Sequence, residues 1–162
     1  MSKKINFIGI DPGSCSGCIA FLQVNGNSEI VFSHTIEFDK KTNKEWFEEL
    51  KELTEGDDNY CILEKVHGLP GSNVAAVSSF MKNVGHIEMA LIALEIPFRE
   101  VTPQMWMKHY GMKREKEESK TEWKKRLREL LQRIMPSFKV TNNTADAMLI
   151  AYYALNISKG WA

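Results

Sequence analysis

The beginning of the chain restricts the fold more than any other feature, because three strand-like segments follow one another there. Residues 5–10 form a short apolar run that Asp11-Pro12-Gly13 ends sharply. Residues 18–24 and 29–38 come next, and the Asn25-Gly26-Asn27 sequence between them is typical of a hairpin, since Asn-Gly tolerates positive φ. The sequence therefore predicts a sheet that begins with three antiparallel strands.

Helices and strands alternate after this beginning. Helical spacing of apolar residues, capping signals and short apolar runs indicate where each element lies. We expect strands at 59–64 and 96–101, and helices at 43–53, 73–94, 103–110, 119–135 and 144–155. This order favours an α/β fold with a mixed five-stranded sheet flanked by helices, parallel where helices cross over.

The length of 162 residues fits one domain, within the usual range of roughly 100–200 residues, so we expect a single domain over 1–162. No run of about 18 apolar residues predicts a membrane span. The amino terminus leads directly into a strand-like run without the pattern of a cleavable signal, which favours a cytoplasmic protein.

Charge is distributed unevenly, although the net formal charge is zero. Residues 1–60 carry 11 acids and 6 bases, whereas residues 61–162 carry 10 acids and 15 bases. The neutral total argues against indiscriminate binding to nucleic acid, but the asymmetry allows one face of the protein to be basic.

Three carboxylates stand at the ends of apolar elements. Asp11 follows the first strand, Glu64 ends the strand at 59–64, and Asp146 lies in the first turn of the last helix. Each has an ordinary explanation alone, as a turn former, a solvated strand end or a partner of the helix dipole. Together they would repel one another unless a cation neutralised them, and their hard oxygen atoms suit Mg²⁺ or Mn²⁺. Such an ion activates water and stabilises charge on a phosphoryl group.

Four segments of the chain together carry a family likeness. They are residues 7–13 (FIGIDPG), 62–66 (ILEKV), 102–106 (TPQMW) and 144–147 (TADA). In this order they resemble the RuvC-like Holliday junction resolvases, with a particular likeness to the phage-encoded branch, over the chain from Ile5 to about Tyr153. The resemblance implies a ribonuclease H-like fold, a homodimer, Mg²⁺-dependent cleavage of four-way DNA junctions with Mn²⁺ as a substitute, and a location in the cytoplasm of a bacterial host cell. Asp11, Glu64 and Asp146 would then be the catalytic, metal-binding acids.

One position departs from this resemblance. RuvC-like enzymes usually carry a fourth acid three or four residues before the position of Asp146, where this sequence has Asn142 and Asn143. We predict Asn143 as a weak metal ligand, because an amide oxygen coordinates without bringing charge. Two explanations stay open: a site that works with three acids, or a site impaired by a natural or engineered substitution.

Basic residues gather in the second half of the chain. Lys120 stands in the first turn of its helix, where a cation opposes the helix dipole, so its placement favours a functional role. It also matches the lysine that RuvC-like enzymes place near the scissile phosphate, which makes it a fourth catalytic candidate. The alternative is an ordinary solvated helix face. The predicted DNA-binding residues are Ser72, Asn73, Lys108, Lys113, Arg114, Lys124 and Arg128.

The helix at 73–94 is apolar on two sides and therefore needs cover on both. A homodimer would provide it and would place two active sites on one symmetric junction. The alternative is a helix that is fully buried within one copy.

Three other functions stay open at this stage. The Asp-x-Gly-x-x-x-Gly string at 11–17 also resembles the phosphate loop of actin-like ATPases and sugar kinases, but those folds need two such domains. A non-catalytic junction-binding protein would explain the missing acid, and a nuclease of the same fold could act on flaps or RNA–DNA hybrids. A zinc site at Cys15 and Cys18 is disfavoured, because no further ligands occur at paired spacing.

Overall fold

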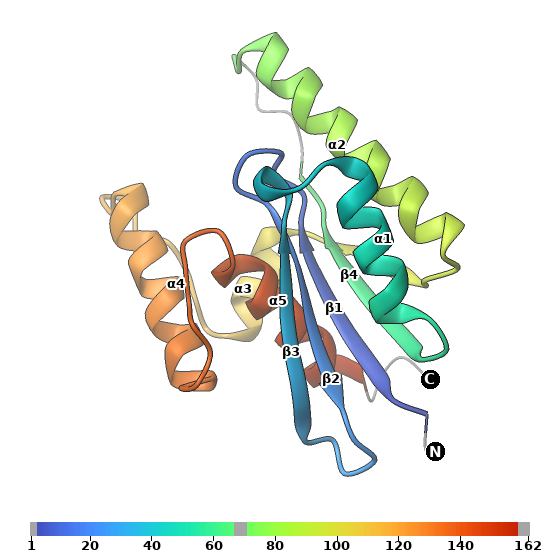
Figure 1. The fold of residues 1–162 in the computed structure, drawn as a ribbon. Helices are drawn as coiled ribbons and strands as arrows, with labels where there is room; N and C mark the ends of the chain where they lie inside the picture. The colour runs from blue at the N-terminus through green and yellow to red at the C-terminus, as the bar shows by residue number, and fades with distance from the viewer. Residues whose placement is uncertain (1–2, 67–70, 159–162) are drawn as a thin grey trace.

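The computed structural model of the chain describes residues 3–66 and 71–158, which contain one five-stranded mixed sheet (Figure 1). The strand order is β3-β2-β1-β4-β5. The first three strands are antiparallel to their neighbours in sequence, whereas β4 is parallel to both β1 and β5. The predicted mixed sheet is therefore confirmed. The strands are β1 (Ile5–Asp11), β2 (Cys18–Val24), β3 (Ile30–Glu37), β4 (Asp58–Glu64) and β5 (Phe98–Val101).

The helices begin where side chains satisfy the free backbone N–H groups of the first turn. Ser119 and Glu122 form a capping box at the start of the predicted helix at 119–135, and Thr42 and Glu45 form a second one. Pro103 stands at the first helical position, as predicted. The helices are η1 (Phe38–Lys40), α1 (Asn43–Thr54), α2 (Val74–Ala93), α3 (Pro103–His109), α4 (Lys120–Ile134) and α5 (Ala145–Ile157).

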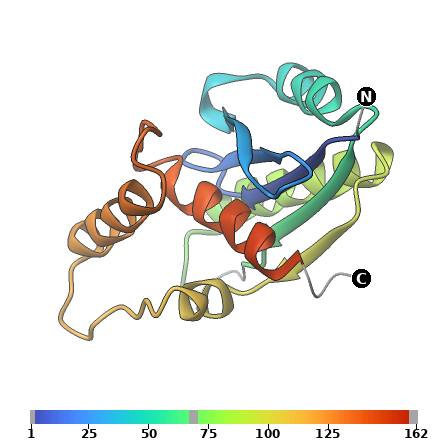
Figure 2. The ribbon, with the colours of Figure 1, turned by 90° about the horizontal axis from the view of Figure 1, so that it is seen from below.

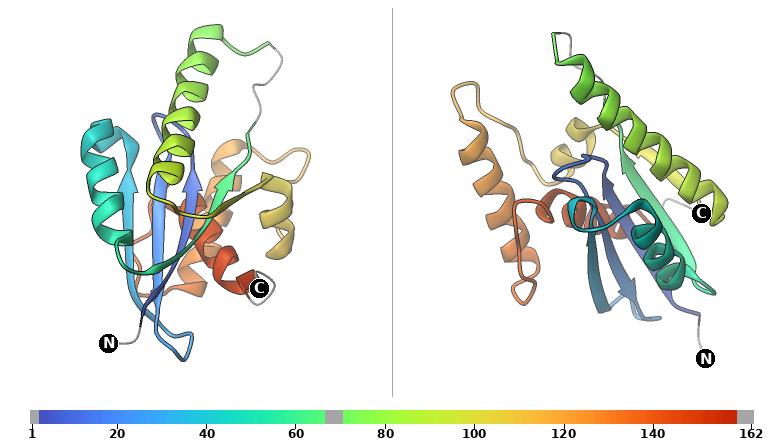
Figure 3. Two further views of the ribbon diagram at one scale, coloured as in Figure 1. Left: turned by 90° about the vertical axis from the view of Figure 1, so that its right-hand side faces the viewer. Right: turned by 45° about the horizontal axis from the view of Figure 1, so that its top comes forward.

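The two faces of the sheet carry separate hydrophobic clusters, because successive side chains of a strand point to opposite faces. Ile8 and Ile10 of β1 face α1 and α2, where Trp46, Leu50 and Ile87 are buried. Phe7 faces the other side with Ile62 of β4, against α3, α4 and α5. Figure 3 shows α1 and α2 on one side of the sheet and α3, α4 and α5 on the other.

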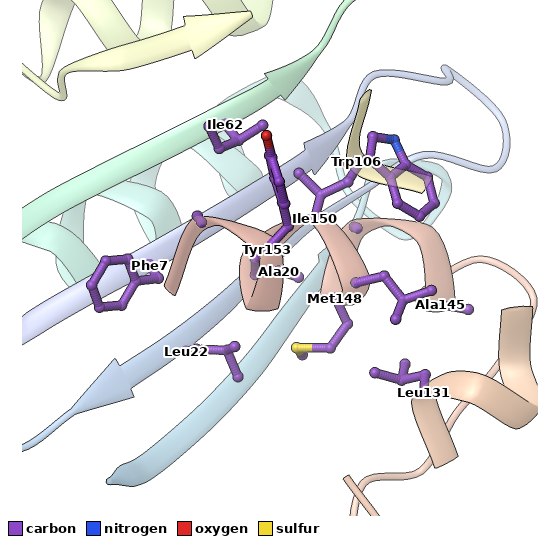
Figure 4. Packing of buried hydrophobic residues seen from close by; sticks show 14 of the residues in the cluster. Phe7, Ala20, Leu22, Ile62, Trp106, Leu131, Ala145, Met148, Ile150 and Tyr153 are labelled. Atoms are coloured by element: carbon purple, nitrogen blue, oxygen red, sulfur yellow. The ribbon is translucent and has the colours of Figure 1, made fainter. Parts of the chain in front are cut away.

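Helix α5 lies directly on β1, and Gly9 makes this approach possible. A Cβ atom built on Gly9 would lie 2.2 Å from both the Ala147 carbonyl oxygen and the Ala151 nitrogen. No larger residue fits, so the missing side chain lets the backbones of strand and helix touch. Figure 2 shows α5 crossing the sheet, and the close-up in Figure 4 shows Ile150 of α5 in one buried cluster with Phe7, Ala20 and Leu22 of the strands. The contact fixes where the first turn of α5 lies relative to the end of β1.

Helix α2 has two apolar sides, and the described residues of one copy do not cover both of them. Only its second half packs on the sheet, through Ile87, Ala90 and Leu91. Its first half projects beyond the strands (Figure 1), where Val74 is 82% exposed and Met81 is 45% exposed. The alternative of a helix buried within one copy is therefore wrong, because the sheet is too short to cover all of α2.

Smaller differences concern boundaries and turns. Strand β5 begins at Phe98, two residues later than predicted. In the hairpin between β2 and β3 the residue with positive φ is Ser28, rather than the Asn-Gly pair. The loop at 68–73, which contains the predicted DNA-binding residues Ser72 and Asn73, is described only from residue 71 onwards. Within the described ranges, no helix has the length and apolar character that crossing a membrane requires.

Candidate active site

Strands β1 and β4 bring Asp11 and Glu64 to the same edge of the sheet. The strands are parallel neighbours, and Ile10 pairs with Leu63, so Asp11 and Glu64 are the next residues on adjacent strands. Both share the sheet face of Phe7 and Ile62, which α5 covers. Two carboxylates thus meet at the carboxyl ends of parallel strands, where α/β folds commonly bind ligands.

Asp146 reaches the same place from the first turn of α5. The Gly9 contact holds that helix against β1, and the Asp146 carboxylate lies close enough to raise the pKa of Asp11. Asp146 is buried, and its Oδ1 atom has no hydrogen-bond partner within the described residues. The position beside the free N–H groups of the helix favours an anion there.

Burial and mutual repulsion raise the free energy of the ionised carboxylates. Burial, followed by the charge of Asp146, raises the pKa of Asp11 to about 6. Burial, followed by the charge of Asp11, raises the pKa of Glu64 to about 8. These are the shifts expected when acids of like charge share a site with little solvent, and such shifts are common at functional sites.

Two neutral donors orient the carboxylates. The indole Nε1 of Trp106, a fully buried residue of α3, donates to Glu64 Oε2 at 2.7 Å. The Gly13 backbone N–H donates to Asp11 Oδ1 at 3.2 Å. Behind this turn, the buried Asn83 amide of α2 donates to the Pro12 carbonyl oxygen at 2.9 Å. Trp106 belongs to the 102–106 segment that carries the family resemblance. The role of Asn83 could not be predicted, because a polar residue inside an apolar helix does not reveal its hydrogen-bond partner.

Lys124 is the cation that meets this group of acids. Its Nζ forms an ion pair with Asp146 Oδ2, and the side chains of Lys124 and Asp146 are 30% and 11% exposed. Burial opposes the charged form of Lys124, but the charges of Asp146, Asp11 and Glu64 together raise its pKa above the ordinary value. Lys124, predicted from the sequence as a DNA-binding residue, thus lies at the carboxylates in the structure.

The other predicted residues lie around this site. Lys120 is exposed in the first turn of α4, one turn before Lys124. Asn142 is exposed and Asn143 is partly buried, in the turn before Thr144. Asn73 caps α2, because its side-chain oxygen accepts from the N–H groups of Ala75 and Ala76.

The remaining DNA-binding candidates lie on α3, on α4, in the linker between these helices and before the start of α2. Arg114 donates to the Glu118 carbonyl oxygen at 3.0 Å. Arg128 is partly buried, and its Nε has no hydrogen-bond partner in the described part of the chain. Lys108, Lys113 and Ser72 are exposed.

The donor set suits a hard divalent cation. Each carboxylate uses one oxygen for a partner, namely Trp106, the Gly13 N–H or Lys124, and in the described ranges its other oxygen has none. Such free carboxylate oxygens are what Mg²⁺ takes as ligands. Among the described residues, no three His, Cys, Asp or Glu side chains converge closely enough to hold an ion as they stand. The acids interact at a wider spacing than coordination requires.

Two solved structures share this arrangement of elements. RuvC of Thermus thermophilus in complex with a Holliday junction substrate aligns with a TM-score of 0.65 and 14% identity over 97% of this chain and 96% of that one. The chain has the RuvC fold. A second T. thermophilus RuvC structure aligns with a TM-score of 0.59 and 15% identity over the same shares. No protein-family model and no curated protein sequence matches the chain. The relation to the phage-encoded branch stays a prediction.

Proposed function

We propose that the chain is a divalent-metal-dependent endonuclease that resolves four-way DNA junctions or related branched DNA. The observation that supports this most is the meeting of Asp11, Glu64 and Asp146 at one buried edge of a RuvC-like sheet. A related fold is known in complex with a Holliday junction substrate. Buried acids of this kind have a high energetic cost, which a bound cation offsets.

The same three acids would hold Mg²⁺, with Mn²⁺ as a substitute and Asn143 as a weak additional ligand. When bound, the ion would activate water and neutralise charge that develops on the phosphate. Trp106 keeps the Glu64 carboxylate in one orientation, and the Gly13 N–H does the same for Asp11. Lys120, exposed near the start of α4, would contact the scissile phosphate.

DNA would lie along α4 and the linker before it. Lys124 and Arg128 are one turn apart on α4, and the unpartnered Arg128 Nε suits a phosphate oxygen. Lys108, Lys113 and Arg114 would extend this surface, and Ser72 with Asn73 would contact DNA from the start of α2. Because phosphate contacts release counterions, binding should weaken steeply with salt, and charge reversal at Arg128 should flatten that dependence.

A homodimer would form through α2. Val74, Met81 and Ile92 are exposed apolar residues, and their spacings of 7 and 11 residues place them on one side of the helix. A second copy would cover this side and bring two active sites to the two strands that a junction resolvase must cut.

The decisive experiment incubates end-labelled four-way junctions with the protein and Mg²⁺. Linear duplex of the same sequence is the substrate control, and Asp11→Asn is the protein control. We expect nicks in the junction, little cleavage of the duplex and none with the variant. If the wild type cuts neither junctions, flaps nor RNA–DNA hybrids, the catalytic assignment fails.

A non-catalytic junction-binding protein is the second candidate. It is favoured by the absence, among the described residues, of three acids close enough to hold an ion as they stand. That protein would bind the junction with equal affinity with EDTA and with Mg²⁺, and it would leave the strands intact. Gel-shift and cleavage assays on one sample distinguish the two candidates.

A further inference from the structure

The ion pair between Lys124 and Asp146 lies inside the candidate site, and it has a consequence for how many metal ions the site takes. Lys124 is held by its helix, because its neighbours Trp123 and Leu127 are buried in the core that α4 shares with α5. Its ammonium group is therefore presented to the acids by a fixed backbone. A freely moving surface lysine would gain little from such a pair.

The charges of the site balance for one divalent ion. Asp11, Glu64 and Asp146 bring three negative charges, and Lys124 cancels one of them. The remaining charge of minus two is balanced by the plus-two charge of a single Mg²⁺ ion. A second ion would leave an excess of positive charge in a largely buried place, where uncompensated charge is costly.

The arrangement of oxygen atoms agrees with this balance. Lys124 takes Asp146 Oδ2 and leaves Asp146 Oδ1 without a hydrogen-bond partner in the described residues. Asn143, next to this site in sequence, adds no charge that could hold a further ion. Each acid thus has one oxygen engaged by the protein and one left for an external cation.

We propose that Lys124 takes the place of a second divalent cation, so that the site is built for one metal ion and a lysine. This inference rests on the proposed function, because it concerns the same carboxylates. Lys124 supplies the fixed positive charge that a second ion would otherwise bring to the phosphate. It also competes with metal for Asp146, so removing it should strengthen metal binding while weakening cleavage.

Manganese binding to the metal-free protein tests the proposal without reference to activity. Free Mn²⁺ is counted by electron paramagnetic resonance while the ion is titrated into the full chain. We expect one Mn²⁺ per chain for the wild type. Lys124→Gln should bind Mn²⁺ at least about tenfold more tightly, because a buried positive charge beside Asp146 is gone. In junction cleavage the same variant should be at least about tenfold slower at saturating metal.

Three further variants make the outcome specific. Lys124→Arg keeps the charge and should keep one Mn²⁺ with nearly the wild-type affinity. Lys125→Gln is the matched control, because Lys125 pairs with Glu129 on the exposed side of α4, and it should change nothing. Asn143→Asp combined with Lys124→Gln should bind two Mn²⁺ per chain, whereas Asn143→Asp alone should still bind one. Circular dichroism verifies that each variant is folded.

The possible failures are distinguishable. Two Mn²⁺ on the wild-type chain, or an unchanged affinity in a folded Lys124→Gln variant, would overturn the role of Lys124 while metal-dependent cleavage stands. A single ion in the double variant would also overturn it, since the lysine would not be what blocks the second ion. No Mn²⁺ binding and no cleavage by the wild type would overturn the proposed function, and this inference with it.

Discussion

Helices α5 and α2 are both rich in apolar residues, yet they are buried to different extents. Nine residues of α5 are buried, and the helix touches β1 along its backbone. Only Asn83, Ile87, Ala90 and Leu91 of α2 are buried, and in its first half Val74 and Met81 are exposed in one copy. Apolar composition therefore says that a helix will be covered, but not whether its own chain supplies the cover. The covered helix carries a catalytic candidate, and the uncovered one suits a second copy.

The largest effect expected from this comparison is that of Gly9→Ala. A Cβ at Gly9 meets the backbone of α5 at 2.2 Å, so strand and helix must separate, which should lower the free energy of unfolding by about 3 kcal/mol. Gly85→Ala in α2 is the matched change, because a Cβ there meets nothing within 4 Å. It should raise helix stability by up to about 1 kcal/mol. Urea unfolding measures the change in the free energy of unfolding for both variants. Equal changes would mean that α5 lies farther from β1 than the structure shows.

The second effect is electrostatic and belongs to the α5 side alone. Because the folded state raises the pKa of Asp11 from 3.8 to about 6, it binds a proton more tightly than the unfolded chain does. The resulting stabilisation is complete below pH 4 and is lost as the pH rises through about 6. Asp11→Asn should thus stabilise the metal-free protein by about 2 kcal/mol at pH 8 and hardly at all at pH 4. Thermal melts in EDTA at both pH values test this, and a pH-independent difference would contradict it.

Much of the fold could be predicted because its signals are local. The Asp11-Pro12-Gly13 stop and the Ser119 capping box each mark a boundary through neighbours in sequence. The partner of Lys124 could not be predicted, because it depends on the angle at which α4 crosses α5. Sequence spacing showed that Lys120 and Lys124 share a helix face, but not which of them reaches the acids. The two apolar sides of α2 predicted that one copy would leave part of this helix exposed. Which part is exposed could not be predicted, because the sequence does not reveal how far the sheet extends beneath the helix.

A third effect compares one tryptophan on each face of the sheet. Trp106→Phe removes the donor to Glu64, and a buried carboxylate that loses its hydrogen bond should cost about 1–2 kcal/mol. Trp46→Phe on the α1 side removes a donor to the Asn43 side chain, a neutral partner at 3.0 Å. We expect a loss below about 1 kcal/mol for Trp46→Phe. Only Trp106→Phe should weaken Mn²⁺ binding, because only it frees a metal-ligand candidate to reorient. Equal loss of Mn²⁺ binding in both variants would point to a general effect on folding.

The smallest effect on stability, and the most direct test of the comparison, concerns the exposed side of α2. Met81→Lys and Ile92→Lys replace residues that are 45% and 58% exposed, so within one copy the free energy of unfolding should change by less than about 0.5 kcal/mol. If a second copy covers these residues, the pair of changes should convert a dimer into a monomer in sedimentation at micromolar concentration, because each dimer would bury four lysines. Met105→Lys is the control, since Met105 is similarly exposed on α3 and should leave the dimer intact. A wild-type chain that sediments as a monomer would mean that α2 keeps its apolar side open for a different partner, and the difference between α2 and α5 would then need an explanation other than dimerisation.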